Sequence, residues 1–396
     1  MLAERARRLQ PSATLAIAAR ARALRAQGID VLSFSAGEPD FDTPERVKAA
    51  AVRALAEGHT KYTDTAGIPD LRAAICAKLK RDNDLDYEPA EVIVSVGAKH
   101  TLYNIGAVLF DPGDEVLVPA PYWVSYTEQV RLFDGRPVVV PTDEARGFQL
   151  DVAALRAAVT PRTRALILNT PNNPTGAVYG RPDLEAVAAL AVERGIWIVS
   201  DECYEALSYE GRVPSIATLG PAVKARTLVV HTCSKAYAMT GWRIGYAAGP
   251  REVVRAMADF QGQCTSNPAS VAQWAAVEAL AGPQDDVAKM AGEFDRRRRA
   301  IVEGLNRVPG IRCAMPQGAF YAFPDVSGLF GRRWRGGALA TSADVTAFLL
   351  EDARVAVVPG ADFGSDRHLR LSYACGLDTI EEGLRRIAAA CAALSP

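Results

Sequence analysis

The chain has 396 residues, enough for roughly two to three domains and a large buried core. Lys and Arg total 45 and Asp and Glu total 46, so the net charge is −1, and no overall field attracts nucleic acid or an anionic membrane. Hydrophobic residues make up 49% and charged residues 23%, a globular composition that disfavours disorder, collagen and coiled coil.

Seven short apolar runs alternate with helix-sized segments in the middle of the chain. Near-continuous runs of Val, Ile and Leu are typical of strands in a sheet that is covered on both faces. We therefore predict an α/β fold in which a mostly parallel seven-stranded sheet fills one large domain. The expected strands are 92–96, 115–118, 137–140, 165–168, 196–199, 227–230 and 244–247.

The pattern changes after about residue 285, where a smaller α+β domain is expected. We place its boundaries at 1–44 and 286–396, around a large domain of 45–285. Thr43 and Pro44 offer an N-cap and a first helical residue at the start of the large domain. The expected elements of the small domain are a long helix over 285–308, strands at 319–323 and 369–373, and helices near 343–351 and from 378 onward.

Four consecutive arginines, residues 296–299, lie in the long helix expected over 285–308. The simplest interpretation is a solvated helix face, with one or two side chains whose aliphatic stems lie along the surface while their charged ends reach water. A binding patch is the less favoured alternative.

Several common classes of protein lack support in this sequence. No G-x-G-x-x-G follows a strand and no G-x-x-x-x-G-K-[ST] is present, which disfavours nicotinamide dehydrogenases and P-loop enzymes. The four histidines are isolated and the seven cysteines form no C-x-x-C, so we expect neither a metal site nor disulfides. Because there is no signal core and no apolar run of about 18 residues, we expect a cytoplasmic protein without membrane contact.

A lysine follows the strand expected at 227–230. Burying Lys235 at a strand end is costly unless it has a task. The hydroxyls of Thr232 and Ser234, together with Arg243 eight residues after Lys235, are suitable donors to a phosphate. Pyridoxal phosphate requires this set of groups, because an amine forms a Schiff base with its aldehyde while the other groups hold its phosphate.

Two further motifs end neighbouring strands. The carboxylate of Asp201 can keep a pyridine nitrogen protonated, which makes the ring an electron sink, and Tyr204 can donate to the ring hydroxyl. Taken alone, Asp201 could equally be a helix N-cap. The turn at 170–176 places the Asn173 amide at the carboxyl end of a strand, where ligands bind in open α/β sheets.

With these motifs the chain resembles the class I aminotransferases of the pyridoxal-phosphate fold-type I superfamily, in the subgroup of bacterial aspartate and aspartate/prephenate aminotransferases. The likeness runs nearly end to end, from 11–14 and 36–41 to 369–373. It implies that Lys235 is the Schiff-base lysine, that Asp201 partners the pyridine nitrogen, and that Tyr204 and Asn173 donate to the ring hydroxyl. The remaining implied cofactor contacts are Gly97, Ala98, Lys99, Thr232, Ser234 and Arg243 at the phosphate, Trp123 stacked on the ring, and Tyr62 of the neighbouring subunit.

One position departs from the family pattern. Family members usually carry Ser where Thr232 stands here, and the added methyl group affects only the expected tightness of phosphate binding.

The resemblance also assigns the substrate. Arg370, which alone could be a surface residue, would bind the α-carboxylate through its planar guanidinium. Lys99 with Ser12 and Thr14 would bind the distal carboxylate of aspartate or glutamate. Ser12 and Thr14 could equally be helix caps, and Lys99 could serve only the phosphate. The full set of implied substrate contacts is Gly37, Trp123, Asn173, Arg370, Lys99, Ser12 and Thr14.

The implied activity is amino transfer from L-aspartate, or a related amino acid, to 2-oxoglutarate. The implied path is a ping-pong mechanism through internal aldimine, external aldimine, ketimine and pyridoxamine phosphate, in a homodimer with shared active sites. Prephenate, alanine or aromatic aminotransferases and carbon-sulfur lyases stay open as alternatives. A pyridoxal-binding regulator without turnover normally needs an appended DNA-binding domain, for which the roughly 40 residues before the fold leave no room.

Overall fold

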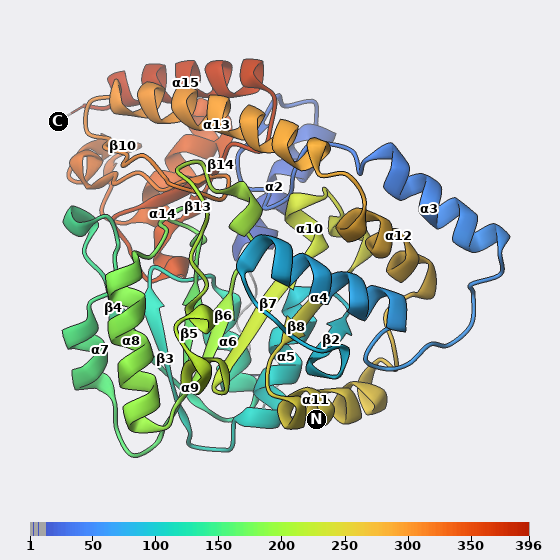
Figure 1. The fold of residues 1–396 in the computed structure, drawn as a ribbon. Coiled ribbons are helices and arrows are strands. Elements are labelled where there is room, and N and C mark those ends of the chain that lie inside the picture. The colour runs from blue at the N-terminus through green and yellow to red at the C-terminus, as the bar shows by residue number, and fades with distance from the viewer. Residues whose placement is uncertain (1–2, 4–6, 8–12, 396) are drawn as a thin grey trace.

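A seven-stranded sheet lies at the centre of the larger part of the molecule in this computed structural model, which describes residues 3, 7 and 13–395 (Figure 1). Its order is β2-β8-β7-β6-β5-β3-β4, in which β8 is antiparallel to both neighbours and the other pairs are parallel. The predicted α/β fold and its mostly parallel seven-stranded sheet are confirmed. The strands are β2 (Val92–Ser95), β3 (Glu115–Ala120), β4 (Arg136–Pro141), β5 (Thr163–Asn169), β6 (Trp197–Asp201), β7 (Thr227–Thr232) and β8 (Gly245–Ala248).

The strands are apolar throughout because both faces of the sheet are covered. Ile167 and Val199 enter the cluster on one face, while their chain neighbours Leu166 and Ile198 enter the cluster on the other. Helices α5 (Ala98–Leu109), α6 (Ser125–Leu132) and α11 (Arg251–Cys264) cover the first face. The opposite face is covered by α4 (Pro69–Asn83), α7 (Val152–Ala158), α8 (Arg181–Arg194), α9 (Pro221–Lys224) and α12 (Ser270–Ala281).

The carboxyl ends of the three central strands meet at one edge of the sheet. Asn169 on β5 pairs with Asp201 on β6, and Asp201 pairs with Val230 on β7. The short helix α10 (Cys233–Ala236) begins directly after β7. The register of the sheet therefore brings the lysine motif, Asp201 and the Asn173 turn to the same edge.

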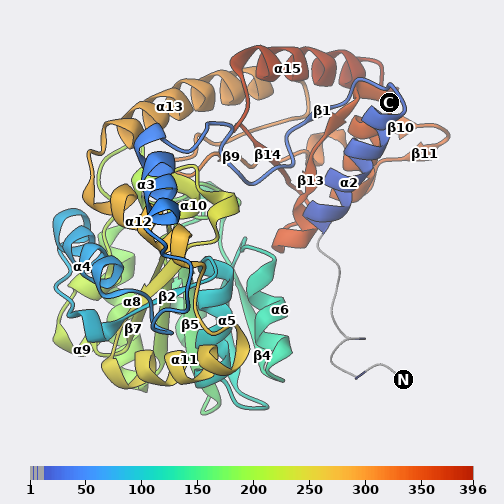
Figure 2. The same ribbon diagram turned by 90° about the vertical axis from the view of Figure 1, so that its right-hand side faces the viewer.

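A smaller α+β part joins the two ends of the described chain, as predicted. Its first strand, β1 (Leu32–Ser33), is parallel to β12 (Val355–Ala356), so an N-terminal segment pairs with a C-terminal one. In Figure 2 the long helices α13 and α15 lie along the top of this part. Its other elements are α2 (Ala13–Ala26), α13 (Asp285–Asn306), β9 (Tyr321–Ala322), α14 (Ser342–Phe348), β13 (Val358–Pro359), β14 (Leu369–Ser372) and α15 (Leu377–Ala392).

Two local predictions are wrong. Pro44 rather than Thr43 is the N-cap of α3 (Glu45–Ala56), because the Thr43 hydroxyl instead donates to the carbonyl oxygen of Ala238 at 2.7 Å. The run of four arginines is not simply a solvated face, because the side chains of Arg297 and Arg298 are only 7% and 3% exposed.

Two findings bear on the environment of the chain. No helix within residues 13–395 is long and apolar enough to cross a lipid bilayer. All seven cysteines are free thiols, and four of them are buried.

Candidate active site

A cavity of about 250 Å³ lies at the carboxyl ends of β5, β6 and β7. Most of the residues expected at a site line its wall, and they come from the sheet, from α5, and from both ends of the described chain. Gly97 lies directly behind this wall, against Arg243. The lining residues include Gly37, Ala98, Lys99, Trp123, Asn173, Asp201, Tyr204, Thr232, Ser234, Lys235, Arg243 and Arg370.

Among the described residues, one expected site residue lies outside this cavity. Tyr62 is 90% exposed and lies outside the lining set. Ser12 lies outside the described residues. Of Thr14 only the backbone is described, as the second residue of α2.

Lys235 projects into the cavity from α10. Its Nζ donates to the carbonyl oxygen of Gly37 at 2.5 Å and lies 5.8 Å from the centre of the Tyr204 ring. Burial lowers the pKa of the Lys235 amine to about 8. Because only the uncharged amine is nucleophilic, this shift raises the fraction of reactive Lys235 near neutral pH.

Asp201 ends β6 with a carboxylate that is fully enclosed. Its Oδ2 accepts from the Tyr126 hydroxyl at 2.7 Å, and its Oδ1 accepts from the backbone N–H of Cys203 at 3.2 Å. Burial raises the pKa of Asp201, whereas these two hydrogen bonds favour the ionised form and oppose the rise. The carboxylate is thus held in place, with little contact with water.

Two tyrosines meet close to Lys235. The hydroxyls of Tyr204 and Tyr321 are 2.8 Å apart and both side chains are buried. Burial holds the pKa of Tyr204 well above its usual range, so the hydroxyl keeps its proton and remains a donor. No motif in the sequence indicates a role for Tyr321 or Tyr126; the one signal is the position of Tyr321 in the strand expected at 319–323.

Arg370 is a buried cation without an acidic partner. Its Nη1 donates to Asn173 Oδ1 at 3.1 Å and its Nη2 to the carbonyl oxygen of Ser35 at 3.0 Å, while Nε has no partner. Its guanidinium lies 4.6 Å from the centre of the Tyr321 ring. No carboxylate of the described residues forms an ion pair with it. Such a charge is costly to bury, so the site suits an anion that the described residues do not supply.

The opposite end of the cavity suits a phosphate. Gly97, at φ 82°, precedes the first turn of α5, and no side chain caps that helix. A Cβ on Gly97 would lie 2.3 Å from Nη2 of Arg243, so only glycine lets the guanidinium approach the helix N-terminus. The Thr232 and Ser234 hydroxyls are 2.9 Å apart beside them. Backbone N–H groups, a guanidinium and hydroxyls together form an anion site.

Lys99 lines the same cavity from the first turn of α5. Its Nζ is 4.9 Å from the centre of the Trp123 ring. Burial, reinforced by the positive charge of Arg243, lowers the pKa of Lys99. The geometry is compatible with a contact either to the phosphate or to a substrate carboxylate.

These groups fit pyridoxal phosphate. Lys235 would supply the amine, Asp201 a carboxylate for the ring nitrogen, and the first turn of α5 with Arg243 a cradle for the phosphate. Trp123 supplies a flat wall, which is held edge-on by Tyr126 at 5.4 Å between ring centres.

Comparison with known proteins agrees with the fold and the site. The family model for aminotransferase class I and II matches residues 29–387. The chain belongs to this family. This aminotransferase is 49% identical to the aspartate aminotransferase of Geobacillus stearothermophilus, over 98% of both chains. It is also 49% identical to a probable aspartate/prephenate aminotransferase of Aquifex aeolicus, over 98% of this chain and 97% of the relative. The crystal structure of the aspartate aminotransferase from Rhizobium meliloti covers 100% of both chains at 47% identity, with a TM-score of 0.97.

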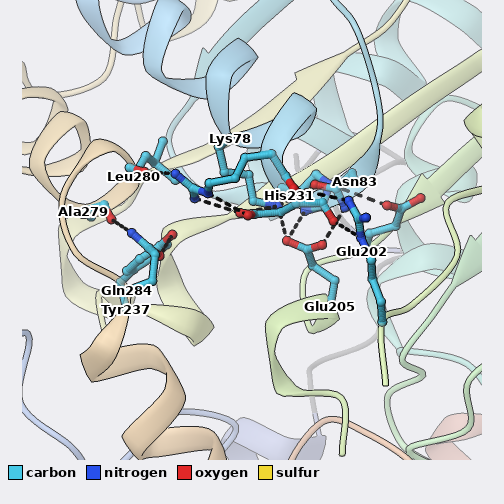
Figure 3. Close-up of polar contacts among 12 residues, drawn as sticks. Lys78, Asn83, Glu202, Glu205, His231, Tyr237, Ala279, Leu280 and Gln284 are labelled. Carbon is cyan, nitrogen blue, oxygen red and sulfur yellow. Dashed lines mark hydrogen bonds and ion pairs between the residues drawn. The ribbon is translucent and has the colours of Figure 1, made fainter. Parts of the chain in front are cut away.

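The aminotransferase also carries a polar cluster on the back of the same strands (Figure 3). Lys78 contacts Glu205 and donates to Asn83 Oδ1 at 2.7 Å, and Asn83 in turn donates to Glu205. Glu202 Oε2 lies 3.6 Å from Nε2 of His231. We define these five residues as the rear cluster. No motif in the sequence predicted this cluster.

Proposed function

We propose that this aminotransferase uses pyridoxal phosphate to transfer the amino group of L-aspartate, or of a related amino acid, to 2-oxoglutarate. The observation that carries the proposal is the buried Arg370 guanidinium, which has hydrogen-bond partners but no acidic one among the residues that the structure describes. It lines the same cavity as Lys235 and Lys99. Two basic side chains beside one amine suit a dicarboxylic amino acid.

Each polar side chain of the cavity has a separate role in the proposed reaction. Bound pyridoxal phosphate supplies an electron sink for the charge that develops at the substrate Cα. Lys235 Nζ, whose pKa is lowered to about 8, would take the proton from the substrate Cα and would deliver it to C4′ of the cofactor. Asp201 keeps the ring nitrogen protonated, and Tyr126 keeps Asp201 in place. Tyr204 and Asn173 donate toward the ring hydroxyl.

At the phosphate we propose contacts from Gly97, Ala98, Thr232, Ser234 and Arg243. The first turn of α5 and the Arg243 guanidinium support this assignment, since both point donors to one place. The α-carboxylate of the substrate binds Arg370, beside Gly37. The distal carboxylate binds Lys99, together with Ser12 and Thr14.

The test of the substrate is the variant Lys99→Ala, assayed with aspartate, glutamate, alanine and phenylalanine at saturating cofactor. A charge-assisted contact contributes about 1.5–3 kcal/mol, so kcat/KM for the two acidic substrates should fall about 10- to 150-fold. The neutral substrates should be little affected. Lys80→Ala, which removes a lysine whose side chain is 70% exposed, is the control. An equal loss for all four substrates would assign Lys99 to the cofactor.

Prephenate is a second candidate acceptor. Two relatives support it: the probable aspartate/prephenate aminotransferase of Aquifex aeolicus and the aspartate/prephenate aminotransferase of Cereibacter sphaeroides, each 49% identical to this chain. Turnover of aspartate with prephenate in place of 2-oxoglutarate tests it directly.

We further propose that the working unit is a homodimer in the cytoplasm, in which Tyr62 reaches the phosphate of the partner's site. The 90% exposure of Tyr62 and the exposed Val52 (65%) and Leu55 (56%) support an uncovered surface here. Mixed dimers of Tyr62→Ala with Lys235→Ala test it, because one native site is regenerated only if Tyr62 acts across the interface. No regained activity in mixed dimers would contradict the proposal.

We also propose the division into a large cofactor-binding domain of 45–285 and a small domain of 1–44 with 286–396. The parallel pairing of β1 with β12 supports the assignment of the N-terminal segment to the small domain.

A further inference from the structure

The four-arginine run of α13 consists of two exposed and two buried side chains. Arg296 and Arg299, each 60% exposed, pair with acids one turn earlier in the same helix, Glu293 and Asp295. Arg297 and Arg298 are almost completely buried. A buried guanidinium is costly unless its partners compensate it, so the partners of these two side chains show what they hold.

Arg297 holds the segment that follows Gly37. Its Nη1 donates to Asp40 Oδ1 at 2.7 Å and its Nε to Glu293 Oε1 at 2.9 Å. Its guanidinium lies 5.1 Å from the centre of the Phe41 ring. The side chain thus fixes Asp40 and Phe41 on α13 by one ion pair and one cation–π contact. Three residues before Asp40, the carbonyl oxygen of Gly37 accepts from Lys235 in the cavity.

Arg298 holds the loop that precedes Tyr321. Its Nη1 donates to the carbonyl oxygen of Pro316 at 2.6 Å, and its Nη2 lies 2.6 Å from Asp295 Oδ1. Its guanidinium also lies 4.6 Å from the centre of the Tyr209 ring. The loop beyond Pro316 leads to Tyr321, which stacks under Arg370.

The Pro316 loop also supports the turn that carries Asn173. The backbone N–H groups of Gln317 and Gly318 both donate to the carbonyl oxygen of Gly176 at 2.9 Å. A Cβ on Gly176 would lie only 2.4 Å from Cβ of Pro316, so the loop and the turn are in close contact. The turn in question holds Asn173, which accepts from Arg370.

We propose that Arg297 and Arg298 are positioning residues for substrate: each ties to α13 one of the two loops that border the substrate end of the cavity. Arg297 sets the position of Gly37, and Arg298 sets the positions of Tyr321 and Asn173 around Arg370. The proposal rests on the proposed roles of Gly37 and Arg370 in substrate binding. Neither arginine contacts the phosphate cradle at α5 and Arg243.

The test compares Arg297→Met and Arg298→Met with Arg296→Met and Arg299→Met. Each variant removes one guanidinium from the same helix, but only the first two release a loop. Because a displacement of about 1 Å at a site can cost up to about 100-fold, we expect KM for the amino acid and the oxo acid to rise about 10- to 100-fold in the two buried variants. The exposed variants should stay within about threefold of the wild type.

Two measurements besides activity make the outcome specific. Amide hydrogen exchange should increase at 37–44 in Arg297→Met and at 314–321 in Arg298→Met, and not the reverse. The dissociation constant for pyridoxal phosphate should change by less than about threefold in both variants. If either variant fails to fold, Arg297→Lys and Arg298→Lys keep the charge but reduce the number of fixed hydrogen bonds, and intermediate KM values are expected.

The proposal is overturned if the buried variants lower the melting temperature while KM stays within about twofold of the wild type. Equal increases of KM in all four variants would overturn it as well, because they would indicate general weakening of α13. Arg370→Lys tests the underlying function separately. If that variant keeps its KM for substrate, then the proposed role of Arg370 fails, whatever the two neighbouring arginines do.

Discussion

The cavity with Lys235 and Arg370 lies at the front of β6 and β7, and the rear cluster lies at the back. Both sides bury charged residues, but only the back pairs its positive charge with an acidic side chain of the described chain. At the back, Lys78 lies between Glu205 and Asn83, and Glu202 Oε1 accepts from the hydroxyls of Ser200 and Ser215 at 2.8 and 2.7 Å. At the front, Arg370 has no acidic partner among the described residues, and Lys235 reaches only a carbonyl oxygen.

The difference teaches how to recognise a ligand site in a fold of this kind. Polar burial alone does not distinguish the two faces, since both are rich in titratable groups. The front differs because its positive charge is uncompensated within the described chain, and the missing partner is a ligand. In the rear cluster the positive charge of Lys78 is compensated by Glu205 within the described chain. A substitution on one face should therefore leave the properties of the other face unchanged.

The largest effect is expected for Lys235→Ala. Loss of the proton-transferring amine should lower kcat by about 10⁴-fold, while the dissociation constant for substrate changes little. Single-turnover absorbance measurements would give the rate, and a small primary amine added at high concentration should restore part of it. In the wild type, borohydride reduction and peptide mapping should place the cofactor on Lys235. A label on another lysine would contradict the assignment.

Adjacent residues on β6 allow a matched comparison of the two faces. Asp201→Asn keeps the size of the side chain but removes the charge that faces the ring nitrogen, and should lower kcat by about 10²- to 10³-fold. Glu202→Gln makes the same chemical change one residue later, on the back, and should lower kcat by less than about threefold. Steady-state assays at saturating cofactor would decide. Similar losses in both variants would mean that the rear cluster takes part in catalysis.

Lys78→Met should affect stability rather than catalysis. It leaves Glu205 buried without its cation, and breaking a buried pair costs about 3 kcal/mol of unfolding free energy. The side chains are 5% and 13% exposed, so little solvent screening reduces this cost. Urea unfolding of the wild type and the variant measures it. The double variant Lys78→Met with Glu205→Gln is the control and should recover much of the loss. A fall in kcat per folded molecule would go against the separation of the two faces.

The smallest effect concerns pH. Burial raises the pKa of Glu202 to about 7, above its value in the unfolded chain, so the folded protein holds this proton more tightly. Stability from this group is therefore present at low pH and is lost as the pH rises from about 4.5 through 7. Urea unfolding at pH 5 and pH 8 should show a smaller decline in Glu202→Gln. An unchanged decline would assign it to another group.

The central parts of the site that the sequence predicted share one property: they lie at or shortly after the carboxyl end of a strand. Asp201 ends β6 and Lys235 lies three residues after the end of β7, so the strand pattern placed both at the same edge of the sheet. The seven strands were predictable because alternate side chains of each strand enter apolar clusters on the two faces of the sheet, which makes the strand sequences apolar throughout. Local pattern and sheet geometry were sufficient for these features.

The residues that were missed depend on contacts between distant parts of the chain. Tyr126 reaches Asp201 across 75 residues, and Tyr321 reaches Tyr204 across 117. In the sequence, Arg297 cannot be distinguished from the other three arginines of its run. Its ion pair with Asp40, 257 residues away, is visible only in the structure. Thr43 has the residue type of a helix cap, yet its hydroxyl donates to the carbonyl oxygen of Ala238. In each case a tertiary contact overrides the local signal.

The pairing of β1 with β12 has a consequence for the order in which the protein forms during synthesis. The backbone N–H of Leu32 donates to the carbonyl oxygen of Arg354, and that of Phe34 to the carbonyl oxygen of Ala356. The segment that carries Gly37 is made first but has no sheet partner until nearly the whole chain has left the ribosome. The strands and α5, which form the phosphate cradle, are complete much earlier. A nascent chain can therefore assemble its cofactor cradle before the substrate end of the cavity exists.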